Sequence, residues 1–284
     1  MSLSVKERLQ EIKQALEERL RQILEGEESG LYEAMRYAVL SEGKRYRPLL
    51  LICTGESFGG SRELLLPFAC AIEFIHNYSL IHDDLPSMDN DDWRRGQPTC
   101  HRAFGEDVAL LAGDSLLTLA FEIMAAAPVP ENLVLRKIEA ISEVSRLSGP
   151  KGMIAGQFMD IKLDPADLNE EIMMELMQKK TGALITASVK VGALLGGAPR
   201  EAVELMEKFG ERLGLAFQIR DDILDSTLKT ESKLSRPNFV HLVGLDRARQ
   251  WLHRLVFEAT HLLAGGNLLT EELKYLSYKL LDVA

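Results

Sequence analysis

At residues 62–85 the chain reads RELLLPFACAIEFIHNYSLIHDDL, a mostly apolar segment that ends in two aspartates. Pro67 stands near the start of this segment, where a helix tolerates proline. A helix that is apolar nearly all round lies inside a bundle of helices or lines a cavity within one. The segment therefore predicts a buried helix in an all-α protein.

Apolar residues recur with helical spacing along most of the remaining chain. Glycine pairs fall between the periodic segments, where helices end, and no alternating pattern, repeat or linker interrupts them. We therefore expect a single all-α domain over residues 1–284, with roughly ten helices and a ligand pocket between some of them. Besides the first, the expected helices cover residues 5–23, 34–40, 106–127, 133–147, 170–195, 201–224, 247–263 and 271–281.

The composition limits the classes of protein to consider. The chain has 284 residues, of which 46% are apolar, and a formal net charge of -10. Such an acidic chain is not expected to bind nucleic acid or a membrane surface. No run of eighteen apolar residues predicts a membrane span. Because the start is not a signal or transit peptide and Cys53, Cys70 and Cys100 lack metal-site spacing, we expect a cytoplasmic protein with reduced thiols.

Two clusters of aspartates each follow an apolar helix. The first lies in LIHDDLPSMDNDDWRRG, residues 80–96, and the second in FQIRDDILD, residues 217–225. Asp221 and Asp225 are four residues apart, so they share one helix face, where two like charges repel each other. Apolar neighbours bury part of this face, and a divalent cation would remove the repulsion.

The aspartates of the first cluster are not evenly spaced on a helix. Asp83 and Asp84 are followed by Asp89, which lies off the face of Asp83 on a straight helix. A bulge or helix end at the intervening proline would bring Asp89 back toward Asp83. We expect the remaining pair, Asp91 and Asp92, to face solvent.

Two such clusters, without histidine or cysteine partners, favour a hard divalent cation over a solvated surface. Mg²⁺ fits best, because it binds a few carboxylates and completes its shell with substrate phosphates. The spacing is not that of a calcium-binding EF-hand. Cations lie nearby in GKRYRP, residues 43–48, and at Arg94, Arg95, Lys179 and Lys180. Aspartates bridged by Mg²⁺ and surrounded by cations are what a diphosphate ligand requires.

Five motifs resemble, in order and separation, those of the trans-type isoprenyl (polyprenyl) diphosphate synthase family, and most of all its bacterial farnesyl diphosphate synthases. They are GKRYRP, HNYSLIHDDLPSMDNDDWRRGQPTCH, FGEDVALLAGDSL, KKTGAL and GLAFQIRDDILD. The resemblance is strong over residues 30–226. It implies the isoprenoid synthase fold, an antiparallel all-α bundle of about ten or more helices around a deep apolar cavity, usually a homodimer.

The resemblance also implies a reaction. A short-chain prenyltransferase of this kind condenses isopentenyl diphosphate with an allylic diphosphate, dimethylallyl or geranyl, to make farnesyl diphosphate. The allylic diphosphate ionises in a dry cavity, the isopentenyl double bond attacks, and a proton is lost to the departing diphosphate. Three Mg²⁺ ions are expected, for which Mn²⁺ can substitute. The expected partners are the two small diphosphates and a second copy of the chain, without nucleic acid or membrane.

Positions that match the family motifs carry implied roles. The metal ligands would be Asp83, Asp84, Asp89, Asp221, Asp222 and Asp225. Contacts with the allylic diphosphate would come from Arg94, Lys180, Thr181 and Gln218, and contacts with isopentenyl diphosphate from Lys44, Arg47, His76 and Arg95. Of all these, the implied catalytic residues are Asp83, Asp84, Asp89, Lys180, Asp221 and Asp222. His82 and His101 are expected to be structural.

Product length is predicted to depend on Tyr78, together with its neighbour Ser79. Tyr78 lies five residues before Asp83, so on a helix it is more than one turn below the metal site. In similar family members a bulky residue at this position stops growth at fifteen carbons, and a small one allows twenty. The alternative is that Tyr78 is an ordinary core residue.

One segment departs from the family pattern. Residues 226–245, STLKTESKLSRPNFVHLVGL, are fewer than the family usually has here, and a Gly-Lys pair with its following aspartate is not visible. Lys229, Lys233 and Arg236 are candidate replacements that the sequence does not assign. In the family this loop helps to close the site over the allylic diphosphate, so a catalytically weakened member is one alternative.

Other functions remain open at this level. A geranylgeranyl or geranyl diphosphate synthase would share every motif. A terpene cyclase is disfavoured by GKRYRP and by the second complete aspartate cluster, because it binds no isopentenyl diphosphate. A non-catalytic subunit or structural helical protein is disfavoured because none of the six motif aspartates has been lost.

Overall fold

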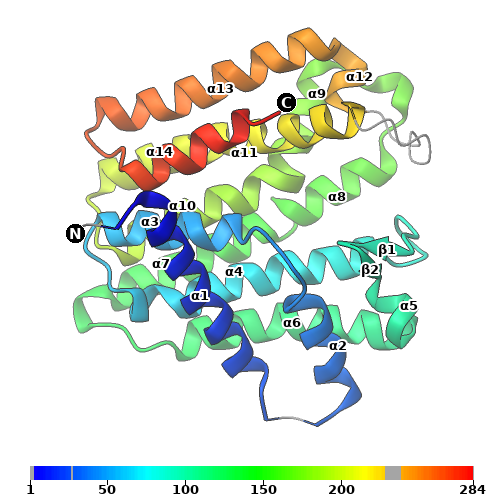
Figure 1. Cartoon of the computed structure of the whole chain (residues 1–284), viewed down its shortest axis with the longest axis horizontal. Coiled ribbons are helices and arrows are strands. Elements are labelled where there is room, and N and C mark those ends of the chain that lie inside the picture. The colour runs from blue at the N-terminus through cyan, green and yellow to red at the C-terminus, as the bar shows by residue number, and fades with distance from the viewer. Residues whose placement is uncertain (1–2, 27, 228–237, 284) are drawn as a thin grey trace.

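The computed structural model describes residues 3–26, 28–227 and 238–283, and helices dominate this part of the chain (Figure 1). The α-helices are α1 (Val5–Leu24), α2 (Gly30–Val39), α3 (Tyr46–Ser57), α4 (Arg62–Asp83), α5 (Cys100–Phe104), α6 (Glu106–Ala126), α7 (Val134–Ser148), α8 (Met153–Lys162), α9 (Glu170–Met177), α10 (Ala183–Leu195), α11 (Arg200–Thr227), α12 (Phe239–Val243), α13 (Leu245–Gly265) and α14 (Glu271–Tyr278). Shorter helical turns are η1 (Glu131–Leu133), η2 (Pro165–Asp167), the π-helical η3 (Gln178–Gly182) and η4 (Lys279–Leu281). The all-α prediction is confirmed.

Helix α4 runs through the middle of the molecule (Figure 1). Its first turn is capped by Ser61, whose hydroxyl accepts a hydrogen bond from the backbone N–H of Leu64. The helix packs against α1, α3, α6 and α10, and side chains such as Phe68 and Phe74 are fully buried. One contiguous apolar core connects these helices, and the single domain over residues 1–284 stays a prediction.

Several elements were not predicted from the sequence. Helix α3 is buried on most sides, so it shows little periodicity, and α5 and α12 are too short to show any. Helix α8 was also missed, and the predicted helix over residues 170–195 is interrupted by the π-helical turn η3. Strands β1 (Trp93–Arg94) and β2 (Gln97–Pro98) pair as a small antiparallel hairpin.

Two helices, α4 and α6, have the length and apolar composition of membrane spans. In α4 the most apolar window is 67% buried inside the protein, as in a core helix. In α6 the corresponding figure is only 33%, and Leu110 and Leu111 on this helix are exposed. This evidence for a membrane is weak, because core helices of globular proteins pass the same test. Cys53, Cys70 and Cys100 are free and buried, in agreement with the expectation of reduced thiols.

Candidate functional site

The first aspartate cluster lies where α4 ends. The helix stops at Asp83, and the backbone N–H of Asp89 donates a hydrogen bond to the Asp83 carbonyl oxygen at 2.8 Å. This turn brings the backbone of Asp89 back to Asp83, as predicted for a helix end before the proline. Asp84 is 3% exposed, and the guanidinium of Arg94 on β1 holds both its carboxylate oxygens, with Nε at 2.9 and 2.8 Å.

The expectation that Asp91 and Asp92 both face solvent is wrong for Asp91. The side chain of Asp91 is only 15% exposed, and its Oδ2 lies 3.9 Å from Nη2 of Arg94. The reason is that the β1–β2 hairpin folds back over the end of α4 and carries Arg94 with it. The side chain of Asp92 is 58% exposed and forms a surface ion pair with Arg102.

The second cluster lies near the end of α11. Burial raises the pKa of Asp221 and the pKa of Asp225 above the ordinary value of an aspartate. Neighbouring cations lower the pKa of Asp221, and a neighbouring carboxylate raises it. Asp222 is 6% exposed, and its two oxygens accept hydrogen bonds from Gln218 Nε2 and from the backbone N–H of Phe239, both at 2.8 Å. Asp222 thereby joins the start of α12 to α11.

Each cluster contains a buried carboxylate that is costly to keep charged in this protein. Burial raises the pKa of Asp83 to about 6, against the opposing effect of Lys180, and Asp89 raises it further. The pKa of Asp222 is also raised to about 6, mainly by burial. A cation bound to the oxygen atoms of these buried carboxylates would stabilise their charged form. Within the described ranges no three His, Cys, Asp or Glu side chains are close enough to hold a metal by themselves.

The π-helical turn η3 carries Lys180 and Thr181. Lys180 Nζ lies 2.6 Å from Oδ2 of Asp160 on α8, and Thr181 Oγ1 donates to Oε1 of Gln218 at 2.7 Å. Together with the bond from Gln218 to Asp222, these contacts connect η3 to the second aspartate cluster. Single π-turns within helices often occur at functional sites.

Two glycines allow neighbouring helices to approach η3 closely. A Cβ atom on Gly156 of α8 would lie 2.2 Å from the backbone nitrogen of Lys180. A Cβ atom on Gly214 of α11 would lie 2.4 Å from the Cα atom of Gly182. Both contacts are with backbone atoms, so a larger residue at either position has to displace the turn that carries Lys180 and Thr181.

Replacement of Gly156 by alanine is therefore expected to shift η3. Overpacking of this kind destabilises a protein by about 1–3 kcal/mol, and displacement of Lys180 should lower kcat as well. Thermal unfolding and steady-state kinetics measure both effects. Gly265→Ala is the matched control, because a Cβ atom there meets nothing within 4 Å. Unchanged stability and turnover in Gly156→Ala would show that the turn does not depend on this contact.

A basic cavity of about 530 Å³ lies beside the start of α3. Its walls include Lys44, Arg47, His76 and Arg95, so the structure brings together the four residues predicted to bind isopentenyl diphosphate. Burial, followed by the charges of the nearby arginines, lowers the pKa of His76 well below its usual value, which leaves the imidazole neutral. No hydrogen-bond acceptor contacts the buried Nε of Arg47 within the described ranges.

A second, more apolar cavity of about 490 Å³ adjoins the basic one. Arg47 and His76 line both cavities, so the two share a wall. Predicted residues on its lining are Tyr78, Ser79, Asp83, Lys180 and Thr181, and its apolar lining includes Met88, Leu117, Met153, Ile154, Phe158 and Ile161. Tyr78 is 6% exposed, and burial raises the pKa of its hydroxyl to about 12, so the ring is a neutral part of this wall.

Sequence reasoning missed several residues of this site. Lys13 on α1 lines the basic cavity, Asp160 holds Lys180, and Gln157 lines the apolar cavity. Arg45 and Glu73 also line the basic cavity and form an ion pair. Glu73 carried a usable signal, because a lone carboxylate inside an apolar helix has to find a buried partner.

The histidines expected to be structural have contacts within the protein. His82 Nε2 lies 3.0 Å from the carbonyl oxygen of Leu110 on α6, and Nδ1 of His101 lies 3.1 Å from Thr99 Oγ1. The candidate replacements for the missing Gly-Lys pair, Lys229, Lys233 and Arg236, lie outside the described residues.

The fold and the two cavities define a class of protein, a helical enzyme that receives charged groups at aspartates and cations and apolar groups in a pocket between helices. Comparison with known proteins identifies the class more closely. Residues 28–237 match the family model described as polyprenyl synthetase, and the chain belongs to this family. Its members are Mg²⁺-dependent prenyltransferases that act on diphosphate substrates. The resemblance found in the motifs is confirmed.

Individual relatives span much of the chain. It is 44% identical to farnesyl diphosphate synthase of Geobacillus stearothermophilus, over 93% of this chain and 86% of the relative. It is 43% identical to the heterodimeric geranylgeranyl pyrophosphate synthase large subunit 1 of Arabidopsis thaliana, over 83% of this chain and 67% of the relative. Among solved structures, an FPP/GFPP synthase from Zymomonas mobilis superposes with a TM-score of 0.86 at 36% identity, over 99% of both chains.

Proposed function

We propose that this chain is a short-chain prenyltransferase that condenses isopentenyl diphosphate with dimethylallyl or geranyl diphosphate to make farnesyl diphosphate. The observation that carries the proposal is the pair of cavities that share Arg47 and His76. One is basic and suits a diphosphate, and the other is apolar, with Asp83 and Lys180 on its lining. A reaction that joins an isoprenoid tail to a diphosphate-bearing unit needs both kinds of cavity side by side.

The allylic diphosphate would lie between the two aspartate clusters. Arg94, Lys180, Thr181 and Gln218 are the residues assigned to hold it, and Asp83, Asp84, Asp89, Asp221, Asp222 and Asp225 are assigned to Mg²⁺. Three ions are expected, with Mn²⁺ as a substitute. The donor set fits, because all six groups supply oxygen and the raised pKa values of Asp83 and Asp222 reflect burial that a cation would offset. Bound Mg²⁺ would stabilise the charge that develops on the leaving diphosphate.

The residues at these clusters have different proposed roles. Asp84 and Asp222 have both oxygens engaged by groups of the protein, so they fix Arg94, Gln218 and the start of α12 as well as facing a cation. Lys180 would donate to the diphosphate oxygens and favour their departure. The hydroxyl of Thr181 is already oriented by Gln218.

The isopentenyl diphosphate would bind at Lys44, Arg47, His76 and Arg95. In this position its double bond faces the apolar cavity, where the allylic carbon becomes cationic. The apolar lining excludes water that would otherwise react with the cation. The double bond attacks, a new carbon–carbon bond forms, and the proton released from the isopentenyl unit passes to the departing diphosphate.

Product analysis tests the proposal directly. The purified protein is incubated with isopentenyl and dimethylallyl diphosphates and Mg²⁺, and the products are dephosphorylated and separated as alcohols. Farnesol is the expected main product. Absence of any prenyl alcohol from the folded protein would contradict the proposed activity and point to a weakened member of the family.

Geranylgeranyl diphosphate is the second candidate product. The Arabidopsis relative, a geranylgeranyl pyrophosphate synthase subunit, is 43% identical and the farnesyl diphosphate synthase of Geobacillus stearothermophilus is 44% identical, so overall identity does not select the product. The choice of farnesyl diphosphate depends on the cavity wall at Tyr78 and Ser79. Tyr78 lies five residues before Asp83 on α4, about 7.5 Å along the helix axis.

Replacement of Tyr78 by alanine is expected to lengthen the product. Loss of the ring deepens the apolar cavity beneath the reacting carbon, so a farnesyl tail can remain bound for another addition. Chromatography of the alcohols should show geranylgeraniol where the wild type gives farnesol. Tyr278→Ala, at an exposed tyrosine, is the control and should leave farnesol unchanged. An unchanged product from Tyr78→Ala would place the limit on tail length elsewhere.

We also propose that the chain is a cytoplasmic homodimer. Exposed apolar side chains lie on the neighbouring helices α6 and α7, including Leu111, Leu135 and Ile138. A second copy of the chain would remove this apolar surface from water. Sedimentation velocity should give a dimer for the wild type and a monomer for the double variant Leu111→Glu and Leu135→Glu. A monomeric wild type would contradict the proposal.

A further inference from the structure

Arg45 has an unusual backbone and a buried side chain. It precedes the first turn of α3 with φ at 51°, in the left-handed region that a non-glycine residue rarely adopts. The residue is 3% exposed, and its guanidinium is fully buried. A buried charge at a strained position persists only where surrounding contacts compensate for both.

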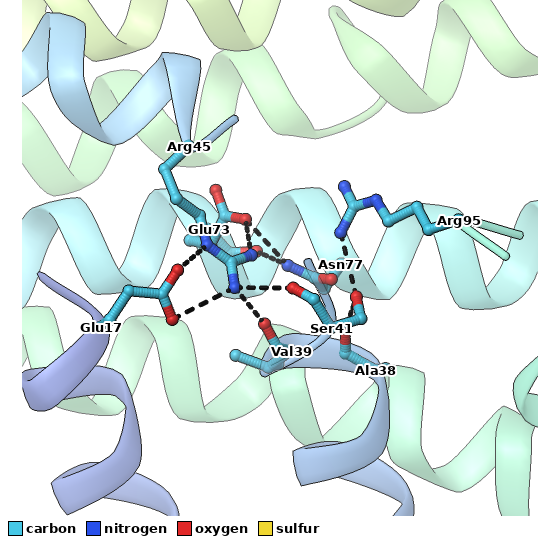
Figure 2. Close-up of polar contacts among 8 residues, drawn as sticks. All are labelled: Glu17, Ala38, Val39, Ser41, Arg45, Glu73, Asn77 and Arg95. Carbon is cyan, nitrogen blue, oxygen red and sulfur yellow. Dashed lines mark hydrogen bonds and ion pairs between the residues drawn. The ribbon is translucent and has the colours of Figure 1, made fainter. Parts of the chain in front are cut away.

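The compensating contacts come from three parts of the chain. Figure 2 shows the guanidinium between Glu17 on α1 and Glu73 on α4. Its Nε lies 2.8 Å from Oε1 of Glu17, and its Nη1 lies 2.6 Å from Oε1 of Glu73. Its Nη2 donates to the carbonyl oxygens of Val39 and Ser41, at 2.7 and 3.0 Å. Arg45 therefore fixes the loop between α2 and α3 to two helices at once.

The same network reaches Arg95, one of the residues assigned to isopentenyl diphosphate. Nη1 of Arg95 donates to the hydroxyl of Ser41 at 3.1 Å, and that hydroxyl donates to the carbonyl oxygen of Ala38 (Figure 2). On the other side, Nδ2 of Asn77 lies 3.3 Å from the Glu73 oxygen that Arg45 contacts. The loop, α1, α4 and Arg95 are thus held in one arrangement.

Arg45 differs in this respect from its neighbours in the motif. All three of its side-chain nitrogens contact oxygen atoms of the protein. Lys44 and Arg47 precede and follow it closely and line the basic cavity, and Nε of Arg47 has no hydrogen-bond acceptor within the described ranges. The motif therefore contains two cations on the cavity wall and one whose side-chain nitrogens are all engaged by the fold.

We propose that Arg45, with its buried partner Glu73 and its partly buried partner Glu17, is a positioning residue for the isopentenyl diphosphate subsite. It sets the loop conformation that places Lys44 and Arg47 on the cavity wall, and through Ser41 it fixes Arg95 on the wall of the same cavity. This inference rests on the proposed function of the basic cavity. It assigns no contact with substrate to Arg45 itself.

Glu73 has a second effect on the same subsite. Burial lowers the pKa of both Arg47 and Arg95, and the carboxylate of Glu73 is the strongest of the charges that oppose this effect. The buried carboxylate therefore lowers the electrostatic cost of holding these two guanidinium groups in the cavity wall. Glu73 is 2% exposed, and its Oε1 accepts a hydrogen bond from Nη1 of Arg45.

The test is the Arg45→Lys variant, which keeps the charge but loses the planar set of donors. We expect KM for isopentenyl diphosphate to rise at least tenfold, while KM for geranyl diphosphate changes less than twofold. Arg62→Lys is the matched control, because Arg62 also contacts a glutamate through Nε at 2.8 Å but lies outside both cavities. The control should leave both KM values unchanged.

A second variant tests the positioning role in case Arg45→Lys does not fold. Glu17→Gln keeps the size of one partner and removes its charge, and it should raise KM for isopentenyl diphosphate in the same selective way, by a smaller factor. Melting temperatures are measured for each variant. If both KM values rise together, or if neither rises in folded Arg45→Lys, the positioning role is overturned.

Variants at the cavity wall separate this inference from the assignment on which it rests. Lys44→Met should raise KM for isopentenyl diphosphate even though it touches no part of the buried network. If it does so and Arg45→Lys does not, the subsite is supported and the positioning role fails. If Lys44→Met leaves KM for isopentenyl diphosphate unchanged, the subsite assignment fails, and the inference about Arg45 falls with it.

Discussion

Asp83→Asn is expected to lower kcat by about a thousandfold or more while leaving the protein folded. The carboxylate lies at the C-terminal end of α4, where the helix dipole disfavours a negative charge, and burial disfavours it further. Because a negative charge at this buried helix end is unfavourable for folding, its presence indicates a role in binding a cation and the diphosphate. Loss of about 4 kcal/mol of transition-state stabilisation corresponds to a thousandfold fall in rate.

The stability of Asp83→Asn distinguishes a functional role from a structural one. Asparagine has nearly the same shape and carries no charge, so the melting temperature should stay the same or rise. Asp92→Asn is the matched control, because it removes an exposed aspartate of the same motif, whose side chain pairs with Arg102 at the surface. More than about a tenth of wild-type turnover in Asp83→Asn would contradict the assignment, as would a large loss of stability.

The general fold could be predicted because its signals are local. The helical period of the apolar residues and the glycine pairs between the segments identified most of the long helices. The helices that were missed lack such a signal. Helix α3 is buried on most of its faces, and α5 and α12 have only five residues each. The π-turn η3 depends on the close approach of Gly156 and Gly214, which no local pattern of the sequence records.

In the candidate site, too, local features could be predicted from the sequence and contacts between distant segments could not. Aspartates and cations within motifs could be assigned from their order, and the structure places Lys44, Arg47, His76 and Arg95 on one cavity. Contacts between distant segments could not be assigned. The pairing of Arg45 with Glu17 and Glu73 joins residues 28 positions apart in each case. Asp91 was misplaced because the hairpin that returns Arg94 to it has strands of only two residues.

Arg47→Met should lower kcat/KM for isopentenyl diphosphate by about a hundredfold or more. Arg47 lines both cavities, so it can contact the diphosphate beside the position where the new bond forms. Hydrogen bonds to charged groups are worth about 1.5–3 kcal/mol each, and a guanidinium can make two to one diphosphate. Methionine keeps the unbranched stem of the side chain and removes both donors and charge.

The same substitution should not destabilise the protein, and this expectation makes the test specific. No ion pair joins Arg47 to a carboxylate in the part of the chain that the structure describes, and burial lowers the pKa of its guanidinium. The charge is therefore unfavourable until an anion enters the cavity, so removing it should leave the melting temperature equal or higher. Its packing at 5.5 Å over the ring of Phe217 can be kept by methionine.

Arg8→Met is the matched control, at an arginine that is paired with carboxylates and lines neither cavity. Arg8 pairs with Glu56 and Glu272 and lines neither cavity, so its loss should leave kcat/KM unchanged and lower the free energy of unfolding by less than about 1 kcal/mol. Arg47→Met should thus lose activity without losing stability, whereas Arg8→Met should keep its activity and lose a little stability. If Arg47→Met instead lowers the melting temperature and activity together, the guanidinium serves the fold, and the shared wall of the two cavities has to be assigned to His76 and the remaining cations.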